Sequence, residues 1–393
     1  MIERIKQPEV QKFIKDHSQH DPFLLSLKQD IFPGLPIKEI ARQIQARQKA
    51  KYKFPSWLDY EGIIYPPPLS VEQASSEKTA AYKSTLFQGQ HFVDLTGGAG
   101  IDCLYFSKRF EKTIYVEKDQ FLAEAARNNF RVMKMPIEVV QAGAGEFLAS
   151  NNRYFDLIYL DPDRRKGKKE FRLQYSQPDV TLLMNDLLQQ GKQVLIKASP
   201  WLDIDHALQD LGLVKEIWVL SIGRDCKEVL YLCEPNKTEN PKINTIDLKE
   251  GLNIEFSFFK KEERLAEAGY ASTLQFLYEP NPALMKAGPF NLLSDRFNLF
   301  KLHPNTHLYT SDSLESKFPG RIFKVREKLQ SSKKGIKHLY GRYHVITRNF
   351  PLQADQLQKK LKIQEGDDGF LIATTDIDHG QLILNCELVF NVH

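Results

Sequence analysis

Cysteine is scarce in this sequence of 393 residues, which contains only four. They lie far apart and form no CxxC pair: Cys103, Cys226, Cys233 and Cys386. This spacing shows neither a zinc ligand set nor a disulfide framework, so we expect no metal and a reducing compartment. The sequence also lacks an apolar signal core behind Met1 and any run of about 18 apolar residues. We therefore expect a cytoplasmic protein that does not enter a membrane.

An excess of one charge is missing as well, because 54 Lys and Arg nearly balance 50 Asp and Glu, for a net charge of +4. This total does not by itself imply a polyanionic partner, so local clusters of charge must decide. No internal repeat and no low-complexity segment is present. With 42% hydrophobic and 26% charged residues, the chain has the composition of ordinary folded domains, and its length suggests two or three of them.

The first 60 residues predict helices, most clearly over 37–53, where apolar residues recur near a 3.6-residue period. The other face of this helix is basic and is either a solvated surface or a surface for phosphate groups: Arg42, Arg47, Lys49, Lys51 and Lys53. Residues 65–70, Tyr-Pro-Pro-Pro-Leu-Ser, predict a stiff extended connector. A capped helix is expected to start at Ser75-Ser76-Glu77.

Between residues 92 and 234 strands and helices alternate, which predicts a largely parallel sheet covered on both faces. The expected strands are 92–95, 113–116, 137–141, 157–160 and 194–196, followed by an antiparallel pair, 217–221 and 229–232, that ends the sheet. The polar segment 234–241 marks a boundary. Beyond it a helical stretch near 282–301 and a final β-α-β-β order suggest a small α+β domain of ferredoxin-like type. We thus expect three domains: 1–74, helical; 75–235, α/β and Rossmann-like; and 236–393, α+β.

A glycine-rich turn follows the first strand, in the sequence Asp94-Leu95-Thr96-Gly97-Gly98-Ala99-Gly100. Glycines at such a turn let the backbone approach a ligand closely. The spacing fails the G-x-G-x-x-G pattern of dinucleotide-binding enzymes, and Asp94 adds a carboxylate that a pyrophosphate would not favour. The turn therefore indicates a nucleotide-like ligand, and Asp94 is placed to accept either from an amino group of that ligand or from the amides of the turn itself.

Two further acidic sites follow later strands. Glu117 stands 23 positions after Asp94, where a carboxylate can accept both ribose hydroxyls. Asp161-Pro162-Asp163 comes directly after the fourth strand. Because the carboxyl ends of parallel strands line the ligand crevice, the Asp161 carboxylate is expected to face an amino group of the substrate.

At these residues the sequence resembles the class I S-adenosylmethionine-dependent methyltransferases. Over nearly its whole length it also resembles bacterial methyltransferases with a THUMP-like C-terminal domain. Four segments carry this resemblance: Ser75-Ser76-Glu77, residues 161–165, residues 278–284 (Tyr-Glu-Pro-Asn-Pro-Ala-Leu) and Phe318-Pro319-Gly320-Arg321. The resemblance implies cofactor contacts from Asp94, Thr96, Gly97, Gly98, Gly100, Glu117, Lys118, Gly143, Ala144 and Asp161. It implies a catalytic loop of Asp161, Pro162 and Asp163.

The sequence departs from that family at two points. Gly143 stands about where many members place an acid against the adenine amino group, so recognition of adenine would rely on backbone groups or on Gln141. The catalytic loop lacks the aromatic residue of the Asn/Asp-Pro-Pro-Tyr form, which stacks on a flipped base. Three other aromatic residues are candidates for that role: Tyr159, Tyr175 and Trp201.

The position after the fifth strand indicates which atom is methylated. Methylation of uracil carbon 5 needs a cysteine nucleophile, and Ser199 occupies the place expected for it. Transfer to nitrogen or oxygen needs mainly positioning and removal of a proton, and we expect transfer to nitrogen.

A run of basic residues beside the catalytic loop indicates that the substrate is an RNA, which we expect to be rRNA or tRNA. The expected contacts are Arg164, Arg165, Lys166, Lys168, Lys169 and Arg172, with Lys197 after the fifth strand. A second basic cluster spans residues 324–342, and THUMP-type domains bind RNA in the families they resemble. The alternatives are a small-molecule methyltransferase and a non-catalytic RNA-binding protein with a degenerate cofactor pocket; no obligate protein partner is expected.

Overall fold

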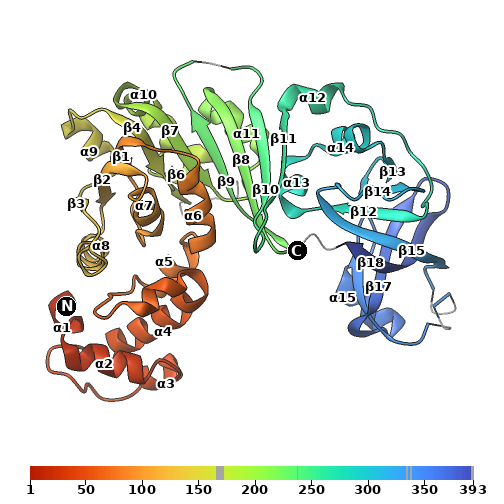
Figure 1. The fold of residues 1–393 in the computed structure, drawn as a ribbon. Coiled ribbons are helices and arrows are strands. Elements are labelled where there is room, and N and C mark those ends of the chain that lie inside the picture. Colours follow the sequence, from red (N-terminus) through yellow and green to blue (C-terminus); the bar gives the residue numbers. More distant parts are fainter. Residues whose placement is uncertain (165–171, 237, 333–334, 337–338, 391–393) are drawn as a thin grey trace. The chain divides into compact units, whose positions relative to one another are not determined.

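The computed structural model describes residues 1–164, 172–236, 238–332, 335–336 and 339–390 (Figure 1). The chain forms two compact units, which are described separately below. Unit 1 comprises residues 1–215 and 230–238, and unit 2 comprises residues 216–229 and 239–393. Within the described residues, no helix is both long enough and apolar enough to cross a membrane.

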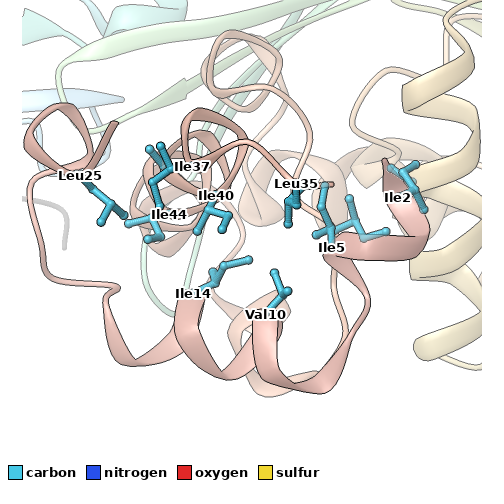
Figure 2. Packing of buried hydrophobic residues seen from close by; sticks show 12 residues of the cluster. Ile2, Ile5, Val10, Ile14, Leu25, Leu35, Ile37, Ile40 and Ile44 are labelled. Carbon is cyan, nitrogen blue, oxygen red and sulfur yellow. The ribbon is translucent and has the colours of Figure 1, made fainter. Parts of the chain in front are cut away.

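Unit 1 begins with helices, as the sequence predicts: α1 (Ile2–Ile5), α2 (Pro8–Asp16), α3 (Pro22–Ser26), α4 (Ile37–Lys53) and the short 3₁₀ helix η1 (Pro55–Asp59). The apolar faces of α1 to α4 meet in one cluster (Figure 2). Ile40 and Ile44 of α4 lie fully buried at its centre, with Val10 of α2 against them. The cluster also takes in Ala125 and Phe121, which anchors these helices to the rest of the unit.

The basic face of α4 makes contacts within the chain. Arg42 pairs with Glu39 at 2.5 Å, Lys49 pairs with Glu72, and Lys53 donates to the Ala74 carbonyl at 2.8 Å. The Arg47 guanidinium donates to the Tyr65 hydroxyl at 2.8 Å. Arg42 therefore pairs within the helix, and the other three cations hold the helix against neighbouring segments.

The connector after these helices is shorter than predicted. Residues 65–67 are extended, but Pro68 opens helix α5 (Pro68–Gln73), so the expectation of an extended chain to residue 70 is wrong. Proline is favoured in the first turn of a helix because its missing N–H has no partner to lose there. Helix α6 (Glu77–Thr85) follows, with Ser76 as its N-cap, as predicted.

The alternating region folds into the expected parallel sheet. Its elements are β1 (Gly89–Asp94), α7 (Ile101–Phe106), β2 (Phe110–Glu117), α8 (Gln120–Val132), β3 (Ile137–Gln141), α9 (Ala144–Ser150), β4 (Phe155–Leu160), β5 (Asp163–Arg164), η2 (Leu173–Tyr175), β6 (Ser176–Gln177), α10 (Val180–Gln190), β7 (Gly191–Ala198), α11 (Ile204–Leu211), β8 (Val214–Ile222), β9 (Asp225–Cys233), β10 (Lys242–Asp247) and β11 (Ile254–Phe259). The nine-stranded order is β11-β10-β8-β9-β7-β4-β1-β2-β3, and β5 pairs separately with β6.

The register of this sheet brings three strand ends together. Asp94 at the end of β1 pairs with Tyr115 of β2 on one side and with Tyr159 of β4 on the other. The turns that leave β1, β2 and β4 therefore open at one edge, where ligands bind in open α/β sheets.

The predicted end of the sheet is wrong. Strand β8 pairs with β10 in parallel, and β10 pairs with β11 in antiparallel fashion, so the β8–β9 hairpin is not the last pair. The polar stretch after β9 conceals this continuation, because such composition is typical of linkers.

The remainder of unit 2 is built on a second sheet. Its elements are α12 (Lys260–Leu265), β12 (Phe276–Pro280), α13 (Pro282–Ala287), α14 (Phe290–Phe297), β13 (Phe300–His303), β14 (Thr306–Ser311), β15 (Gly320–Gln330), β16 (Arg342–Thr347), α15 (Ala354–Leu361), β17 (Gln364–Asp376) and β18 (Gly380–Phe390), and the strand order is β13-β14-β12-β15-β18-β17-β16. The predicted β-α-β-β order is confirmed by β16, α15, β17 and β18, because β17 runs parallel to β16 and antiparallel to β18. The helical stretch expected near 282–301 is confirmed over 282–297, where Gly288, at φ 78°, divides it into α13 and α14; its last two residues belong to β13.

Two of the segments that carry the sequence resemblance pack against each other in this sheet. The buried Glu279 carboxylate of β12 accepts from the Arg321 Nε at 2.7 Å and pairs with Arg348 at 2.6 Å. A Cβ on Gly320 would lie 2.0 Å from the Glu279 carbonyl oxygen, so only glycine fits there. These motifs therefore stabilise the fold of unit 2.

Candidate active site

The glycine-rich turn after β1 is held by its own backbone and by strand β2. The Gly97 amide donates to the Val116 carbonyl at 2.9 Å, and the Gly100 amide donates to the Gly97 carbonyl at 2.8 Å. Gly98 and Gly100 have φ values of 53° and 80°, in the left-handed region that favours glycine. The three glycines thus fix the path of the turn.

Tyr115 of β2 shapes the turn from below. Its hydroxyl donates to the Gly98 carbonyl at 2.7 Å, and its ring meets Phe130 edge-on at a centroid distance of 5.5 Å. A Cβ on Gly97 would lie only 2.2 Å from this ring. Gly97 is therefore required by a tyrosine 18 positions later, a constraint that the sequence alone does not reveal.

Asp94 lies at the floor of the site and is almost fully buried. Its carboxylate accepts from the Thr96 amide at 3.0 Å and from the Thr96 hydroxyl at 3.4 Å. Burial raises the pKa of Asp94 well above its usual range, and the nearby carboxylates Asp102, Asp161 and Glu117 raise it further, against the opposing Thr96 amide. A cation placed beside this group would favour its charged form.

Glu117 at the end of β2 joins two loops of the site. One carboxylate oxygen accepts from the Gly98 amide at 2.9 Å, and the other accepts from the Asp119 amide at 2.8 Å. Each oxygen keeps a further lone pair for a ligand hydroxyl. The carboxylate is thus already oriented before any ligand arrives.

Asp161 follows β4 and is tied to both the turn and β7. Its amide donates to the Thr96 hydroxyl at 2.6 Å, and its carboxylate lies 2.5 Å from the Lys197 ammonium. About a third of its side-chain surface, 35%, remains open. Burial raises the pKa of Asp161, Lys197 opposes the rise, and the carboxylate of Asp102 adds to it.

These residues surround one cavity of about 480 Å³. All ten residues predicted to contact the cofactor line it: Asp94, Thr96, Gly97, Gly98, Gly100, Glu117, Lys118, Gly143, Ala144 and Asp161. Further lining residues were not predicted as site residues, among them Ser70, Gln73, Ala74, Ser75, Asp102, Leu122, Gln177 and Pro178. Four of these come from α5 and the link to α6, which only the pattern Ser75-Ser76-Glu77 could have indicated.

The residues predicted for catalysis and stacking are only partly at this cavity. Asp161 and Asp163 line it, whereas Pro162 is not among its described lining residues. Tyr159 lines it, but neither Tyr175 nor the largely exposed Trp201 belongs to the described lining. Gln141 is likewise outside that lining, so the candidate backbone contacts to adenine come from the segment 142–144.

The predicted RNA contacts are dispersed. The backbone of Arg164 pairs with Ser176 in the β5–β6 pair. Arg172 makes two bonds to the Asp210 carboxylate, at 3.2 Å and 2.6 Å, and Lys197 is buried against Asp161. The other four lie outside the described residues: Arg165, Lys166, Lys168 and Lys169.

No group of three or more His, Cys, Asp or Glu side chains suited to a metal ion occurs in the part of the chain that the structure describes. The polar groups at the cavity include carboxylates, which accept hydrogen bonds, together with hydroxyls and backbone groups. This set suits a ligand that carries amino and hydroxyl groups.

Family models match three parts of the chain. Residues 71–217 match "Conserved hypothetical protein 95", residues 276–319 match a ferredoxin-like domain, and residues 320–387 match a THUMP-like domain. No curated protein matches the chain.

Among solved structures, a protein from Porphyromonas gingivalis W83 named "putative methyltransferase" is 31% identical, with a TM-score of 0.89 over 97% of this chain and 98% of that one. A methyltransferase from Pyrococcus furiosus is 19% identical, with a TM-score of 0.37 over 49% of this chain and 97% of that one. The second score is too low to support an argument. The similarity to the Porphyromonas protein is high enough, and it covers 97% of this chain. The chain therefore belongs to the family of that protein, the class I S-adenosylmethionine-dependent methyltransferases with a THUMP-like C-terminal domain.

Proposed function

We propose that this methyltransferase binds S-adenosylmethionine in the cavity beside the glycine-rich turn and methylates a base nitrogen in rRNA or tRNA. The observation that carries the proposal is the gathering of all ten predicted cofactor residues around one cavity. The cavity volume, about 480 Å³, lies within the range of small-molecule sites. Gly97 lines this cavity and packs closely against the Tyr115 ring, so the path of the turn along the cavity depends on glycine at this position.

The residues of the cavity fit the groups of this cofactor, which supplies an electrophilic methyl on a sulfonium centre. Glu117 would accept the ribose hydroxyls, because its oxygens are already oriented by two backbone amides. Asp94 would accept from the ammonium of the methionine part, and that cation would offset the high pKa of the buried carboxyl. The backbone of residues 142–144, which lines the cavity, would meet the adenine ring.

The acceptor side of the proposal rests on Asp161. An exocyclic amino group needs an acceptor that orients its lone pair toward the methyl, and an open carboxylate at the edge of the cavity can provide it. Asp163 also lines the cavity but is exposed, so it has a weaker claim to the same role.

The RNA part of the proposal rests on basic residues and on the THUMP-like match at residues 320–387. Lys324 and Lys328 are exposed on β15, while Arg326 pairs with Glu387 at 2.9 Å. Arg172 forms an ion pair with Asp210 at 2.6 Å, so we propose the lysines of the run 164–172 for the phosphate contacts instead. Small-molecule transfer would instead leave all of these cations without a ligand.

The test is transfer of labelled methyl from S-adenosylmethionine to unmodified rRNA and tRNA transcripts. We expect labelled RNA with the wild type, and weaker RNA binding when Lys166, Lys168 and Lys169 are all changed to alanine. The slope of log affinity against log salt should fall by about 0.7 for each phosphate that the variant no longer neutralises. A matched control changes three exposed lysines elsewhere: Lys28, Lys38 and Lys192.

Each outcome of this test has a clear meaning. No binding of S-adenosylmethionine by calorimetry at millimolar concentration overturns the enzyme proposal. Binding of the cofactor with no label in any RNA, and RNA affinity that is insensitive to salt, would favour a small-molecule substrate. Equal losses in the triple variant and its control would remove the phosphate role of the run.

Gly143 allows a direct test of adenine recognition. It caps α9 with ordinary φ and ψ of −75° and 153°, and an added Cβ would meet no atom within 4 Å. We expect Gly143→Asp to fold normally, because aspartate is a better N-cap than glycine, and to bind S-adenosylmethionine about tenfold more tightly through the adenine amino group. Calorimetry measures the change, with Gly143→Asn as the uncharged control. An unchanged or weaker affinity for the aspartate variant would place the adenine elsewhere.

A further inference from the structure

A buried polar cluster forms part of the cavity wall, through Ser75, Asp102 and Tyr159, and the proposed function gives no role to most of it. Its members come from four elements of unit 1 and from the link between α5 and α6, and all are buried: Ser75, Lys83, Asp102, Tyr159 and Lys197. Lys83 has no exposed surface at all, and Lys197 retains only 7%. Buried lysines are rare unless they are paired, so this arrangement needs an explanation.

The cluster is joined by short contacts around Asp102. The Lys83 ammonium lies 2.8 Å from one Asp102 oxygen, and the other oxygen accepts from the hydroxyls of Ser75 and Tyr159, each at 2.8 Å. Burial by itself would raise the pKa of Asp102, but Lys83 and Lys197 together lower it. Asp102 is therefore a charged partner of fixed position.

Ser75 links this pair to the residue that holds Asp161. Its hydroxyl accepts from Lys83 at 2.7 Å and from Lys197 at 3.2 Å, and it donates to Asp102. A hydroxyl has one proton and two lone pairs, so these three bonds use its whole capacity. Lys197 then reaches Asp161 at 2.5 Å.

The geometry also limits what Lys197 can do. Its ammonium is enclosed and already bonded to two partners, and moving it to an RNA phosphate would leave Asp161 without its counter-ion. The expected contact between Lys197 and the substrate therefore has weak structural support, and a role behind Asp161 has strong support.

We propose that Ser75, Lys83, Asp102, Tyr159 and Lys197 are positioning residues that hold the Asp161 carboxylate charged and directed at the methyl acceptor. Lys197 supplies the charge that Asp161 needs, and Ser75 fixes Lys197 between the two carboxylates. The acceptor role of Asp161 rests on the proposed function, but the effect of the cluster on Asp161 does not.

The charged groups around Asp161 determine the sign of the effect. Lys197 and Lys83 favour its ionised form, while Asp102 and Asp94 oppose it, and Glu117 and Asp163 line the same cavity. Removing Lys197 therefore raises the pKa of Asp161 further. The carboxylate would then be protonated, and unable to accept, up to a higher pH.

Titration of Asp161 itself tests the proposal without any RNA. The full chain is labelled with ¹³C at the aspartate carboxyl carbon, and the signal of Asp161 is the one lost in Asp161→Asn. In Lys197→Met its midpoint should move up by at least about one pH unit, because an opposite charge at this range shifts a carboxyl by that much. Lys192→Met, on an exposed lysine of the same strand, should leave it unchanged, and Lys197→Arg should restore it.

An unmoved midpoint in Lys197→Met, or an arginine variant that behaves like the methionine variant, overturns the proposal. If Lys197→Met does not fold, Ser75→Ala replaces it, with a smaller shift in the same direction expected and no shift as the contrary result. Where RNA is methylated, the acid limb of kcat against pH should move with the midpoint while KM stays constant. Failure to methylate any RNA leaves the titration intact and counts against the proposed function alone.

Discussion

Replacing Gly97 by alanine is expected to lower the affinity for S-adenosylmethionine at least about tenfold and to destabilise the fold by about 1–3 kcal/mol, the cost of overpacking a filled site. The new methyl would stand 2.2 Å from the Tyr115 ring, which is held in place by its bond to Gly98 and by Phe130. The turn would have to move away from β2. The other lining residues of the turn, Gly98 and Gly100, would move with it.

Calorimetry with S-adenosylmethionine and thermal unfolding measure the two effects. Gly145→Ala, in helix α9, is the matched control. Its Cβ would meet only the Leu183 side chain, at 3.5 Å, which is an ordinary van der Waals distance. A double variant in which Tyr115 is also changed to alanine should recover part of the affinity, because it removes the obstructing ring. Normal binding by Gly97→Ala alone would show that the turn does not hold the cofactor.

The second large effect is expected at Asp161. Asp161→Asn keeps the shape of the side chain but removes the charge that accepts from the methyl acceptor. We expect kcat to fall by about 10²–10⁴, the usual contribution of a group that handles a proton in the transition state. Cofactor affinity should fall far less than kcat, because the other nine residues predicted to contact the cofactor are untouched.

Asp163→Asn is the control for this variant, since Asp163 lines the same cavity but has an exposed side chain. Its rate should stay within about threefold of the wild type if Asp161 alone orients the acceptor. Removing the partner of Lys197 should also lower the melting temperature, so rates are compared well below it. Equal losses in the two variants would spread the role over both carboxylates.

The sequence predicted the parts of this site that follow directly from strand ends. Asp94, Glu117 and Asp161 each stand at or just after the carboxyl end of a strand, and parallel strands bring such positions to one edge. Short apolar strands and well-capped helices are strong local signals, so the ends of these strands could be placed from the sequence. The strand order of a parallel sheet was therefore enough to predict that these three carboxylates lie at one cavity.

The cluster behind Asp161 could not be predicted in this way. Ser75 and Lys197 are 122 positions apart, and Lys83 and Tyr159 are 76 positions apart, with no local pattern that relates them. Lys83 sits in an otherwise ordinary helix, where a lysine normally faces solvent. Only the packing of α6 against α7 and the sheet makes it internal.

The other errors have a common cause in weak local signals. A triple proline predicts an extended chain, yet Pro68 opens a helix, because proline is also favoured in the first turn of a helix. A polar stretch predicts the end of the sheet, yet β10 and β11 continue it. In the first case one residue type fits two local structures, and in the second the pairing of distant strands decides where the sheet ends.

The segment that joins the N-terminal helices to the sheet has a consequence for how the chain is made. The Gln43 amide bonds both backbone groups of Tyr65, at 2.8 Å and 2.9 Å, and the Asn129 amide bonds both backbone groups of Ile64, at 2.8 Å and 2.9 Å. Gln43 is synthesised before its partner, but Asn129 follows Ile64 by 65 residues. At about 5–20 residues per second, the ribosome needs roughly 3–13 s to deliver it. During that interval the backbone of Ile64 has only water or a chaperone as its partner, so the N-terminal helices should complete their folding only after the second strand and its helix have emerged.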